Sequence, residues 1–369
     1  LLAVGDYYTN GSYAMRLESS YTKRYKFRGN FSFRYERQYN SERGFPDFSE
    51  SSVYNIRWSH SQDSKASPSS RFSASVNLGS SNYYQQSVNQ SNTANFLNNT
   101  LSSSVSYSKT FETTPGINFS LTATHSQNTN TGEINMTLPT LQASVDRIYP
   151  FAPAGGSKRG IIQNINLQYN LRAENSFKTT DELFFQPEMF QDAILGAQHS
   201  IPLATNFKIL KYFSVSASTN FEENWVFKTY EKSFDQATNA VVTDTISGFD
   251  AYRTYNFNTS IGTTLYGRKD FSKDSKIQAI RHVMRPSISY GINPAFDQYY
   301  DTYERTSLTD GVTELVEYSR FTGTLYGAPN QNYSSSIGLS ISNTLEAKVR
   351  DKDSTATEPK KIKLLNNFS

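Results

Sequence analysis

Two places in this sequence set a histidine beside a hydroxyl group, the combination that nucleophilic catalysis uses. His60 lies between Ser59 and Ser61, and His125 precedes Ser126. A hydroxyl nucleophile needs its base within hydrogen-bonding reach. Both segments alternate like β-strands, in which neighbouring side chains point to opposite faces, so adjacency in the chain keeps base and hydroxyl apart. We therefore predict no catalytic residue.

Cofactor and metal chemistry have no better support. The chain has no cysteine, which removes thiolate ligands and disulfides. It carries none of the short motifs for zinc hydrolysis, nucleotide phosphates or EF-hand calcium. Its 36 Lys and Arg nearly balance 33 Asp and Glu, for a net charge of +3. We expect no cofactor, no metal site, no enzyme activity and no binding of nucleic acid.

Basic residues form three local groups, and guanidinium groups are suited to binding phosphate. The groups are Lys23, Arg24, Lys26 and Arg28; Lys158 and Arg159; and Arg281 with Arg285. We single out the first group as candidate contacts with the phosphate of a lipid. The alternative is that these charges only solvate the lumen and the strand ends, as charge runs usually do.

The composition is polar and yet rich in aromatic rings. Hydrophobic residues make up 36%, while Tyr and Phe number 25 each, and the mean hydropathy is −0.60. Disordered chains are poor in aromatic residues, which excludes disorder as the main state. A transmembrane β-barrel uses such a composition, because its outer face is apolar, its lumen is polar and aromatic girdles mark both lipid–water boundaries.

Period-two alternation is the dominant pattern. In the segment 26–36 the odd positions hold Phe, Tyr and Gly, and the even positions hold polar and charged residues. Similar alternation recurs in 71–78, 101–108, 117–124, 164–171, 213–221, 255–261 and 337–341. Each such strand has one apolar and one polar face. We predict an all-β fold, a large transmembrane antiparallel β-barrel with roughly fourteen strands in this chain.

Turns and loops separate these segments. Short turns are expected at Thr9–Gly11, Thr114–Gly116 and Asn130–Gly132. Longer polar stretches, expected to be loops, run from Asn40 to Ser52, Ser80 to Asn99, Asp235 to Asp250 and Tyr299 to Tyr318. Short turns alternating with long loops are typical of outer-membrane barrels.

Two features interrupt the rhythm. Residues Thr180 to Ser200 lack alternation, and we predict an irregular, partly helical loop there. Pro139 and Pro286 fall inside strand-like segments. Proline cannot donate to a ladder, so each marks a bulge, an edge or a strand end, and we take both as candidate strand-breaking positions.

Several stretches go beyond general barrel statistics and resemble the barrel of the LptD family, the lipopolysaccharide-assembly proteins of the Gram-negative outer membrane. The matching stretches include 55–63 (NIRWSHSQD), 72–77 (FSASVN), 96–109 (FLNNTLSSSVSYSK), 125–129 (HSQNT), 146–151 (DRIYPF) and 281–287 (RHVMRPS). The resemblance spans most of the chain and is to a cysteine-free branch of the family.

The resemblance implies a two-part protein, with a periplasmic β-jellyroll that receives lipopolysaccharide and a large barrel that inserts it into the outer leaflet. Its implied partners are an LptE-like lipoprotein that plugs the barrel, the periplasmic Lpt bridge components, lipopolysaccharide and outer-membrane lipid. We expect residues 1–369 to be one segment of the barrel domain, without the N-terminal periplasmic domain or the closing strands. No lipid-contact residue is carried over from the family.

Two alternatives remain open at this point. A TonB-dependent receptor or a large porin would share the barrel pattern and would differ in what precedes it in the chain. A cell-surface adhesin or structural β-protein would also alternate, but it would bury its rings in mid-strand. Here aromatic pairs such as Tyr7-Tyr8, Tyr83-Tyr84 and Tyr299-Tyr300 flank the strand-like segments, as girdles require.

Overall fold

The structure is a computed structural model that describes residues 1–87, 100–272, 275–306, 311–349 and 360–368. One antiparallel sheet of sixteen strands dominates it, and a separate hairpin pairs two more. The strands of the sheet are β1 (Leu2–Tyr7), β2 (Tyr13–Lys23), β3 (Phe27–Asn40), β4 (Ser49–Gln62), β5 (Ser70–Gly79), β6 (Thr100–Phe111), β7 (Ile117–Asn128), β8 (Glu133–Ile148), β9 (Asn166–Thr180), β10 (Ile194–Ile209), β11 (Phe213–Asp235), β12 (Ala240–Gly262), β13 (Leu265–Asp270), β14 (Ile277–Asn293), β17 (Ser334–Val349) and β18 (Lys360–Phe368).

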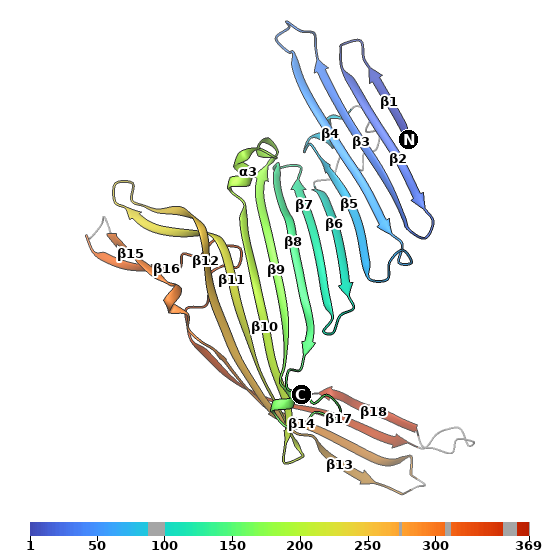
Figure 1. Ribbon diagram of the computed structural model, residues 1–369, viewed down its shortest axis with the longest axis vertical. Coiled ribbons are helices and arrows are strands. Elements are labelled where there is room, and N and C mark those ends of the chain that lie inside the picture. The colour runs from blue at the N-terminus through green and yellow to red at the C-terminus, as the bar shows by residue number, and fades with distance from the viewer. Residues whose placement is uncertain (88–99, 273–274, 307–310, 350–359, 369) are drawn as a thin grey trace.

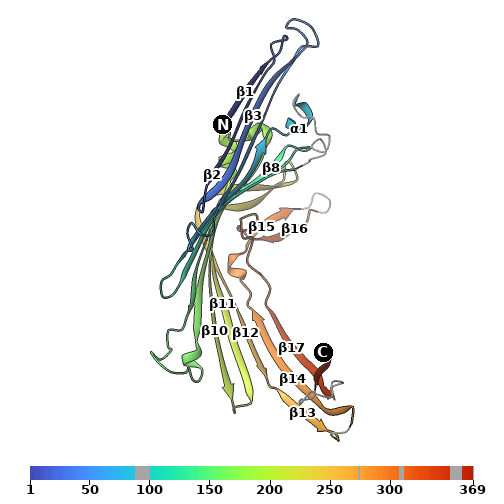
Figure 2. The ribbon, with the colours of Figure 1, turned by 90° about the vertical axis from the view of Figure 1, so that its right-hand side faces the viewer.

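Neighbours in the sheet follow the order of the chain, so the topology is an up-and-down meander. The order runs from β1 to β12 and continues with β14, β17 and β18, while β13 pairs with β14. The hairpin consists of β15 (Asp301–Thr306) and β16 (Thr313–Tyr318). Figures 1 and 2 show a single, strongly curved layer with this hairpin on its concave side. Within the described residues no pairing joins β1 to β18.

The predicted alternation is confirmed by the register. Phe31 lies opposite Trp58, and Phe33 lies opposite Ile56, so apolar side chains form one continuous face. On the other face Arg34 lies opposite Asn55. The long connection between β14 and β17 packs on this polar face, which is therefore the concave one (Figure 2). Curving a sheet in this sense places polar residues inside and apolar residues outside, as in a membrane barrel.

Helical structure is limited to short connecting segments. These are α1 (Tyr83–Gln86), η1 (Ile162–Asn164), η2 (Asp181–Leu183), α3 (Pro187–Gln191) and η3 (Asp297–Tyr299). Among the described residues no helix has the length and apolar character needed to cross a membrane.

The prediction of roughly fourteen strands, made to within two or three, agrees with the sixteen strands of the sheet, and the separate hairpin adds two more. The additional strands include β1 and β13, which span six residues each. Segments this short display too few alternating positions to be recognised from sequence alone.

Two of the expected loops are largely strand. Asp235 to Asp250 contains only a tight turn between β11 and β12, which are 23 residues long each. Tyr299 to Tyr318 contains the β15–β16 hairpin. At about 3.4 Å per residue a 23-residue strand exceeds the hydrocarbon thickness. Its outer part therefore projects into water, where both faces can be polar and alternation disappears.

The predicted irregular loop at 180–200 is wrong for its last seven residues, 194–200. Residues 181–193 hold η2 and α3, but β10 begins at Ile194 and pairs with both β9 and β11. Small and polar residues on the apolar side of this strand end, such as Ala197 and His199, concealed the alternation.

Neither candidate strand-breaking proline ends its strand. Pro139 lies inside β8, where the register with β9 shifts between Thr137 and Thr140. Pro286 lies inside β14 opposite Ile341 of β17, while on the other side the neighbouring backbone is interrupted between β12 and β13. Each proline thus occupies a place where one adjoining ladder is irregular, so its missing N–H interrupts no regular pairing. Of the three readings of Pro139, a bulge, an edge or a strand end, the register shift agrees with the bulge.

Candidate functional site: a polar wall with two unlike ends

The candidate phosphate contacts surround the tight turn between β2 and β3. Lys23 is the last residue of β2, and Arg28 is the second residue of β3. The Arg24 guanidinium lies 4.7 Å from the centre of the Tyr25 ring, and the Lys65 ammonium group of the next turn lies 5.3 Å from the same ring. The structure therefore gathers cations from two turns around one aromatic ring. Lys158 and Arg159 lie in the 149–165 connection at the same end of the sheet, whereas Arg281 and Arg285 lie within β14.

An aromatic group on the convex face borders these turns. The Tyr21 hydroxyl lies 2.9 Å from Nδ1 of His60 and accepts a hydrogen bond of 2.8 Å from the Trp58 indole N–H. Gly29 permits this arrangement, because a Cβ atom there would clash with the Tyr21 hydroxyl. Phe72 packs beside His60, with 5.2 Å between ring centres. Rings with one polar edge are typical of the lipid–water boundary, so the headgroup region begins near this level.

The two ends of the sheet differ in the length of their connections. One end carries the connections 24–26, 63–69, 112–116, 149–165 and 210–212, and we call it the turn end. The other end carries the connections 8–12, 41–48, 80–99, 129–132, 181–193, 236–239 and 294–333, and we call it the loop end. The longest connection of the chain, 294–333, lies at the loop end, whereas the longest one between the described strands of the turn end is 149–165. Outer-membrane barrels keep short turns in the periplasm and long loops outside the cell. On this rule the turn end is periplasmic.

The ends also differ in charge. We count the connections and the four adjoining residues of each strand, within the described part of the chain. Cations at the turn end are Lys23, Arg24, Lys26, Arg28, Lys65, Arg71, Lys109, Arg147, Lys158, Arg159, Lys208, Lys211, Arg268, Lys269, Lys276, Lys348, Lys360, Lys361 and Lys363, against the carboxylates Asp63, Glu112, Asp146, Asp270 and Glu346. The turn end is therefore strongly basic.

At the loop end the balance is reversed. Carboxylates there are Asp6, Glu42, Asp47, Glu50, Glu133, Asp181, Glu182, Glu188, Asp192, Asp235, Asp297, Asp301, Glu304, Glu314 and Glu317, against the cations Arg16, Arg37, Arg43, Lys178, Lys232, Arg305 and Arg320. The overall charge of +3 conceals this separation. This separation of charge between the two ends was not recognised from the sequence, although assigning the charged residues to alternate strand ends would have revealed it.

A long connection covers part of the polar wall at the loop end. Phe321 is fully buried and packs against Tyr252 of β12, with 4.7 Å between ring centres. The Tyr326 hydroxyl donates a hydrogen bond of 2.9 Å to the backbone carbonyl of Arg172 in β9, and burial raises the pKa of Tyr326 to about 12. The Arg320 guanidinium donates a hydrogen bond of 2.8 Å to the Asp250 carboxylate, and this bond raises the pKa of Arg320.

The sequence pattern predicted a loop only from Tyr299 to Tyr318, whereas the connection between β14 and β17 runs over 294–333. The buried aromatic residues in 319–330 were the available signal. Because this segment is fixed on the concave face, it narrows the polar interior on the side of β9 to β12.

A second buried group joins β5, β7 and the 181–193 connection. Asp181 accepts hydrogen bonds from the Gln127 side-chain amide over 2.6 Å and from the Ser81 backbone N–H over 3.0 Å. Gln127 is 1% exposed. This contact spans a gap in the wall, because β5 pairs with β6 only over 70–75. Asp181 thus holds the wall together where the ladder has ended.

The histidines do not form nucleophile–base pairs with their neighbouring serines in the described structure. His60 and His199 contact the hydroxyls of Tyr21 and Tyr169 through Nδ1, and His282 contacts the Asn343 side-chain oxygen through Nε2. His125 is buried beside the Phe184 ring. These imidazole rings pack within the wall, and none of them is hydrogen-bonded to a neighbouring serine hydroxyl in the described residues.

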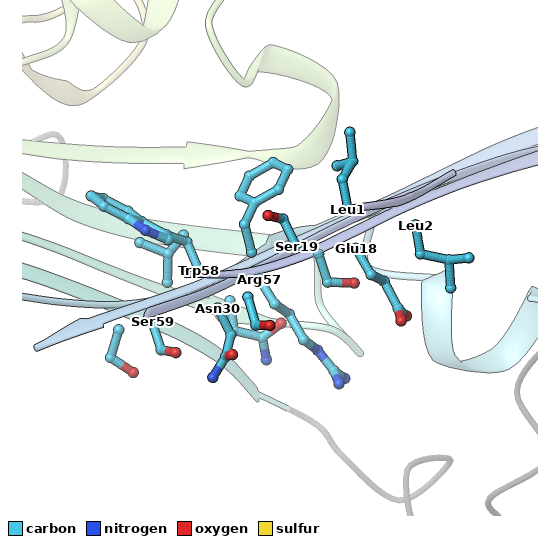
Figure 3. Close-up of a pocket in the computed structure, with 14 residues that line it drawn as sticks. Leu1, Leu2, Glu18, Ser19, Asn30, Arg57, Trp58 and Ser59 are labelled. Atoms are coloured by element: carbon cyan, nitrogen blue, oxygen red, sulfur yellow. The ribbon is translucent and has the colours of Figure 1, made fainter. Parts of the chain in front are cut away.

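Figure 3 shows a further open cavity over β1 to β5, of about 710 Å³, where Trp58 and Arg57 point to opposite sides of the sheet. Its lining runs from Leu1 and Leu2 across β2, β3 and β4 to β5, so it is an open groove across several strands and not an enclosed binding chamber.

Together these features define a class of protein: a curved antiparallel wall with an apolar convex face, a polar concave face and an aromatic boundary, as in outer-membrane β-barrels. A family model described as LptD protein matches residues 1–369, and the chain belongs to this family of outer-membrane proteins. Residues 96–99, part of one stretch that carried the resemblance, lie outside the described residues.

Other comparisons add little. No curated protein matches the chain. One similar solved structure is a double mutant of the Serratia marcescens hemophore receptor HasR in complex with its hemophore HasA and heme. The sequence identity is 7% and the TM-score is 0.29, and the match covers 92% of this chain and 57% of that receptor. The chain thus spans little more than half of that receptor, and a likeness this weak carries no argument about function.

Proposed function

We propose that this chain forms part of the wall of a translocon that passes lipopolysaccharide through the outer membrane and inserts it into the outer leaflet. The observation that carries the proposal is the match of the whole chain to the LptD protein family. The geometry is compatible with it, because a glycolipid needs a polar route for its sugars and phosphates beside an apolar phase for its acyl chains.

The two faces of the wall suit these two requirements. Rows of Ser and Asn, such as Ser216 opposite Ser260, line the concave face, while Phe221 and Tyr255 pair on the convex face. A polar interior exchanges hydrogen bonds with sugar hydroxyls as water does, so passage of a headgroup there has no large desolvation cost. The proposal gives this chain no catalytic step, and energy would come from elsewhere because no nucleotide-binding motif is present.

The proposed partners are those that the family implies. Periplasmic Lpt bridge components would deliver lipopolysaccharide to the basic turn end, and an LptE-like lipoprotein would occupy the polar interior. A barrel of this many strands encloses a wide lumen that must be filled if it is not to leak. The 294–333 connection contacts only the wall from β9 to β12 among the described strands, which leaves the concave face of β1 to β8 for a partner.

The function is tested by depleting the full-length protein in its own host and following newly made lipopolysaccharide to the cell surface. We expect surface arrival to stop while synthesis continues. If arrival is normal and the uptake of an iron carrier fails instead, the protein is a TonB-dependent receptor.

The plugging partner has a separate test. The intact protein is purified in mild detergent, and we expect a lipoprotein to co-elute in fixed stoichiometry. If the full-length barrel elutes alone and is non-conducting in planar bilayers, no plugging partner is needed.

A further inference from the structure

An unbalanced group of charges lies on the polar face at the turn end. A cavity of about 230 Å³ opens there between β13, β14, β17 and β18. Its lining includes the cations Arg268, Arg281, Lys348 and Lys361, together with Glu346. Ala279 forms part of its floor and is buried. The cavity is therefore a small basic recess in the wall.

The register shows that like charges face one another across two ladders of this recess. Arg268 of β13 lies directly opposite Arg281 of β14. Lys348 of β17 lies directly opposite Lys361 of β18. Like charges in directly opposed positions destabilise a sheet, because the Cβ atoms of the two residues are only about 5 Å apart. Two such pairs in one recess represent a cost that folding alone does not explain.

Among the residues that the structure describes, the carboxylates nearby are too few to offset these cations. Asp270 pairs with its strand neighbour Arg268 at 2.7 Å. Glu346 lies 3.9 Å from Arg281 and also faces Lys363 across the other ladder. No ion pair with a carboxylate is found for Lys348 or Lys361 in the described part of the chain. The positive charge that remains is exposed, since the side chains of Arg268 and Arg281 are 60% and 52% accessible.

A matched recess at the opposite edge of the same face shows what a balanced group looks like. It has a similar volume, about 240 Å³, and contains Arg16 and Arg34 with Asp6 and Glu36. Arg16 and Arg34 also face each other across a ladder, but Glu18 lies within 3.7 Å of one and 3.3 Å of the other. There the protein supplies the counter-charge itself.

We propose that the recess formed by Arg268, Arg281, Lys348 and Lys361 binds a phosphoryl group carried by a lipid. A phosphate between the two opposed pairs accepts charge-assisted hydrogen bonds from both and replaces their repulsion with attraction. The guanidinium forks suit bidentate contact with phosphate oxygens, and the ammonium groups add charge without fixed geometry. The exposed Tyr266 ring, 5.2 Å from the Arg281 guanidinium, flanks the recess.

Two lipids present the same phosphoryl chemistry on this side of the membrane. One is the phosphorylated glucosamine end of lipopolysaccharide, and assigning this ligand rests on the proposed function. The other is an anionic phospholipid of the periplasmic leaflet, which needs only that the chain is an outer-membrane wall. The recess lies on the polar face, so the ligand reaches it from the periplasmic opening of the lumen.

The test measures lipid binding by the full-length protein in neutral detergent micelles. Three probes are used: diphosphoryl lipid A, the same lipid after removal of both phosphates, and phosphatidylglycerol. The variants are Arg268→Gln with Arg281→Gln, and Lys348→Gln with Lys361→Gln. The matched control is Arg16→Gln with Arg34→Gln, which removes the same number of cations from the balanced recess.

We expect each variant of the basic recess to bind diphosphoryl lipid A about tenfold or more weakly, since a charge-assisted hydrogen bond contributes roughly that factor. The control should bind as the wild type does, and the dephosphorylated probe should not distinguish the proteins. Equal losses for phosphatidylglycerol would identify the leaflet lipid as a ligand, and losses for lipid A alone would identify the cargo.

Thermal stability without lipid gives a second readout that does not depend on a binding assay. Removing one member of each opposed pair, as in Arg268→Gln with Lys361→Gln, relieves repulsion, so the variant should unfold at the wild-type temperature or above it. Adding diphosphoryl lipid A should then stabilise the wild type and not the variant.

The proposal is overturned if the recess variants and the control bind all three probes alike, or if lipid stabilises wild type and variant equally. These binding measurements do not involve transport. A protein that binds phosphate here but does not export lipopolysaccharide would retain the site and lose the proposed function.

Discussion

The loop end and the turn end of this wall are built by different physical means. At the loop end, connections fold back on the sheet, bury Phe321 completely and satisfy the Asp181 carboxylate with buried donors. At the turn end, most connections are short, and cations such as Lys23 and Lys26 are exposed around a tight turn. The loop end is therefore stabilised by buried contacts, and the turn end exposes positive charge.

This difference separates residues that stabilise the chain from residues that are available to a ligand. Buried aromatic and carboxylate groups lose many contacts when they are altered, whereas exposed charges lose few. Substitutions should therefore unfold or loosen the loop end and leave the stability of the turn end almost unchanged. The effects on binding should show the opposite distribution.

The largest effect is expected for Phe321→Ala. Truncating a fully buried Phe costs about 3–5 kcal/mol through lost contacts and the cavity left behind. Because Phe321 fixes the 294–333 connection on β12, the loss should appear as faster proteolysis in that connection. Tyr266→Ala at the turn end, where the ring is 67% exposed, is the matched control. Similar protease sensitivity of the two variants would contradict the contrast between the ends.

Between the ends, the wall itself should distinguish its two faces. Leu121 belongs to the apolar row of β7, and Ser120 belongs to the polar row. Leu121→Arg should cost about 2–4 kcal/mol in a bilayer, because it brings a cation into hydrocarbon. Ser120→Arg should cost much less. Unfolding by denaturant from lipid vesicles measures both, and equal costs would be incompatible with a membrane wall of this orientation.

Asp181→Ala should have the next largest effect. It removes the acceptor of the Ser81 N–H and one acceptor of the buried Gln127 amide, which still donates to the Gly79 carbonyl and the Ser81 hydroxyl. The lost hydrogen bonds to a charged group contribute about 1.5–3 kcal/mol. The matched change at the turn end is Asp63→Ala, which removes an exposed bond to the Lys65 N–H. Hydrogen exchange at the ends of β5 and β7 should accelerate only in the first variant. Acceleration in neither would mean that the gap beside β6 is closed by other contacts.

The candidate phosphate contacts should have almost no effect on stability. Replacing Lys23, Arg24, Lys26 and Arg28 by Gln, one at a time, should change the free energy of unfolding by no more than about 0.5 kcal/mol each. If the group does contact lipid phosphate, association with vesicles that contain phosphatidylglycerol should weaken and lose part of its salt dependence. Unchanged association would favour the simpler reading, in which these charges only solvate the strand ends.

The smallest effect concerns pH at the tip of the β11–β12 hairpin. A hydrogen bond from the Thr238 hydroxyl, together with the backbone N–H of Ala237, lowers the pKa of Asp235. A carboxyl whose folded pKa is lowered stabilises the fold above its unfolded pKa and loses that contribution as the pH falls through the folded value. The protection factor for amide exchange at the tip, which removes the intrinsic pH dependence of exchange, should be constant from neutral pH down to about 4 and fall below it. Asp235→Asn should abolish this change.

The sequence alone determined the fold class and the facing of side chains, because alternation with period two is a local property of the backbone. Phe31 and Phe33 were assigned to one face from their spacing, and the register with Trp58 and Ile56 confirms it. It also indicated the LptD family from stretches distributed along the chain. Short strands were missed because they have too few positions to display the alternation. The water-exposed hairpins were missed because they have no apolar face.

The tertiary structure alone decided which distant residues meet. Tyr326 and Arg172 are 154 positions apart and bond across the concave face, and no local pattern specifies such a contact. The opposition of Arg268 to Arg281 and of Lys348 to Lys361 depends on strand register, which a shift of one residue would abolish. Alternation fixes the face on which a charge lies, but only pairing fixes which charge stands opposite it, and that opposition creates the basic recess.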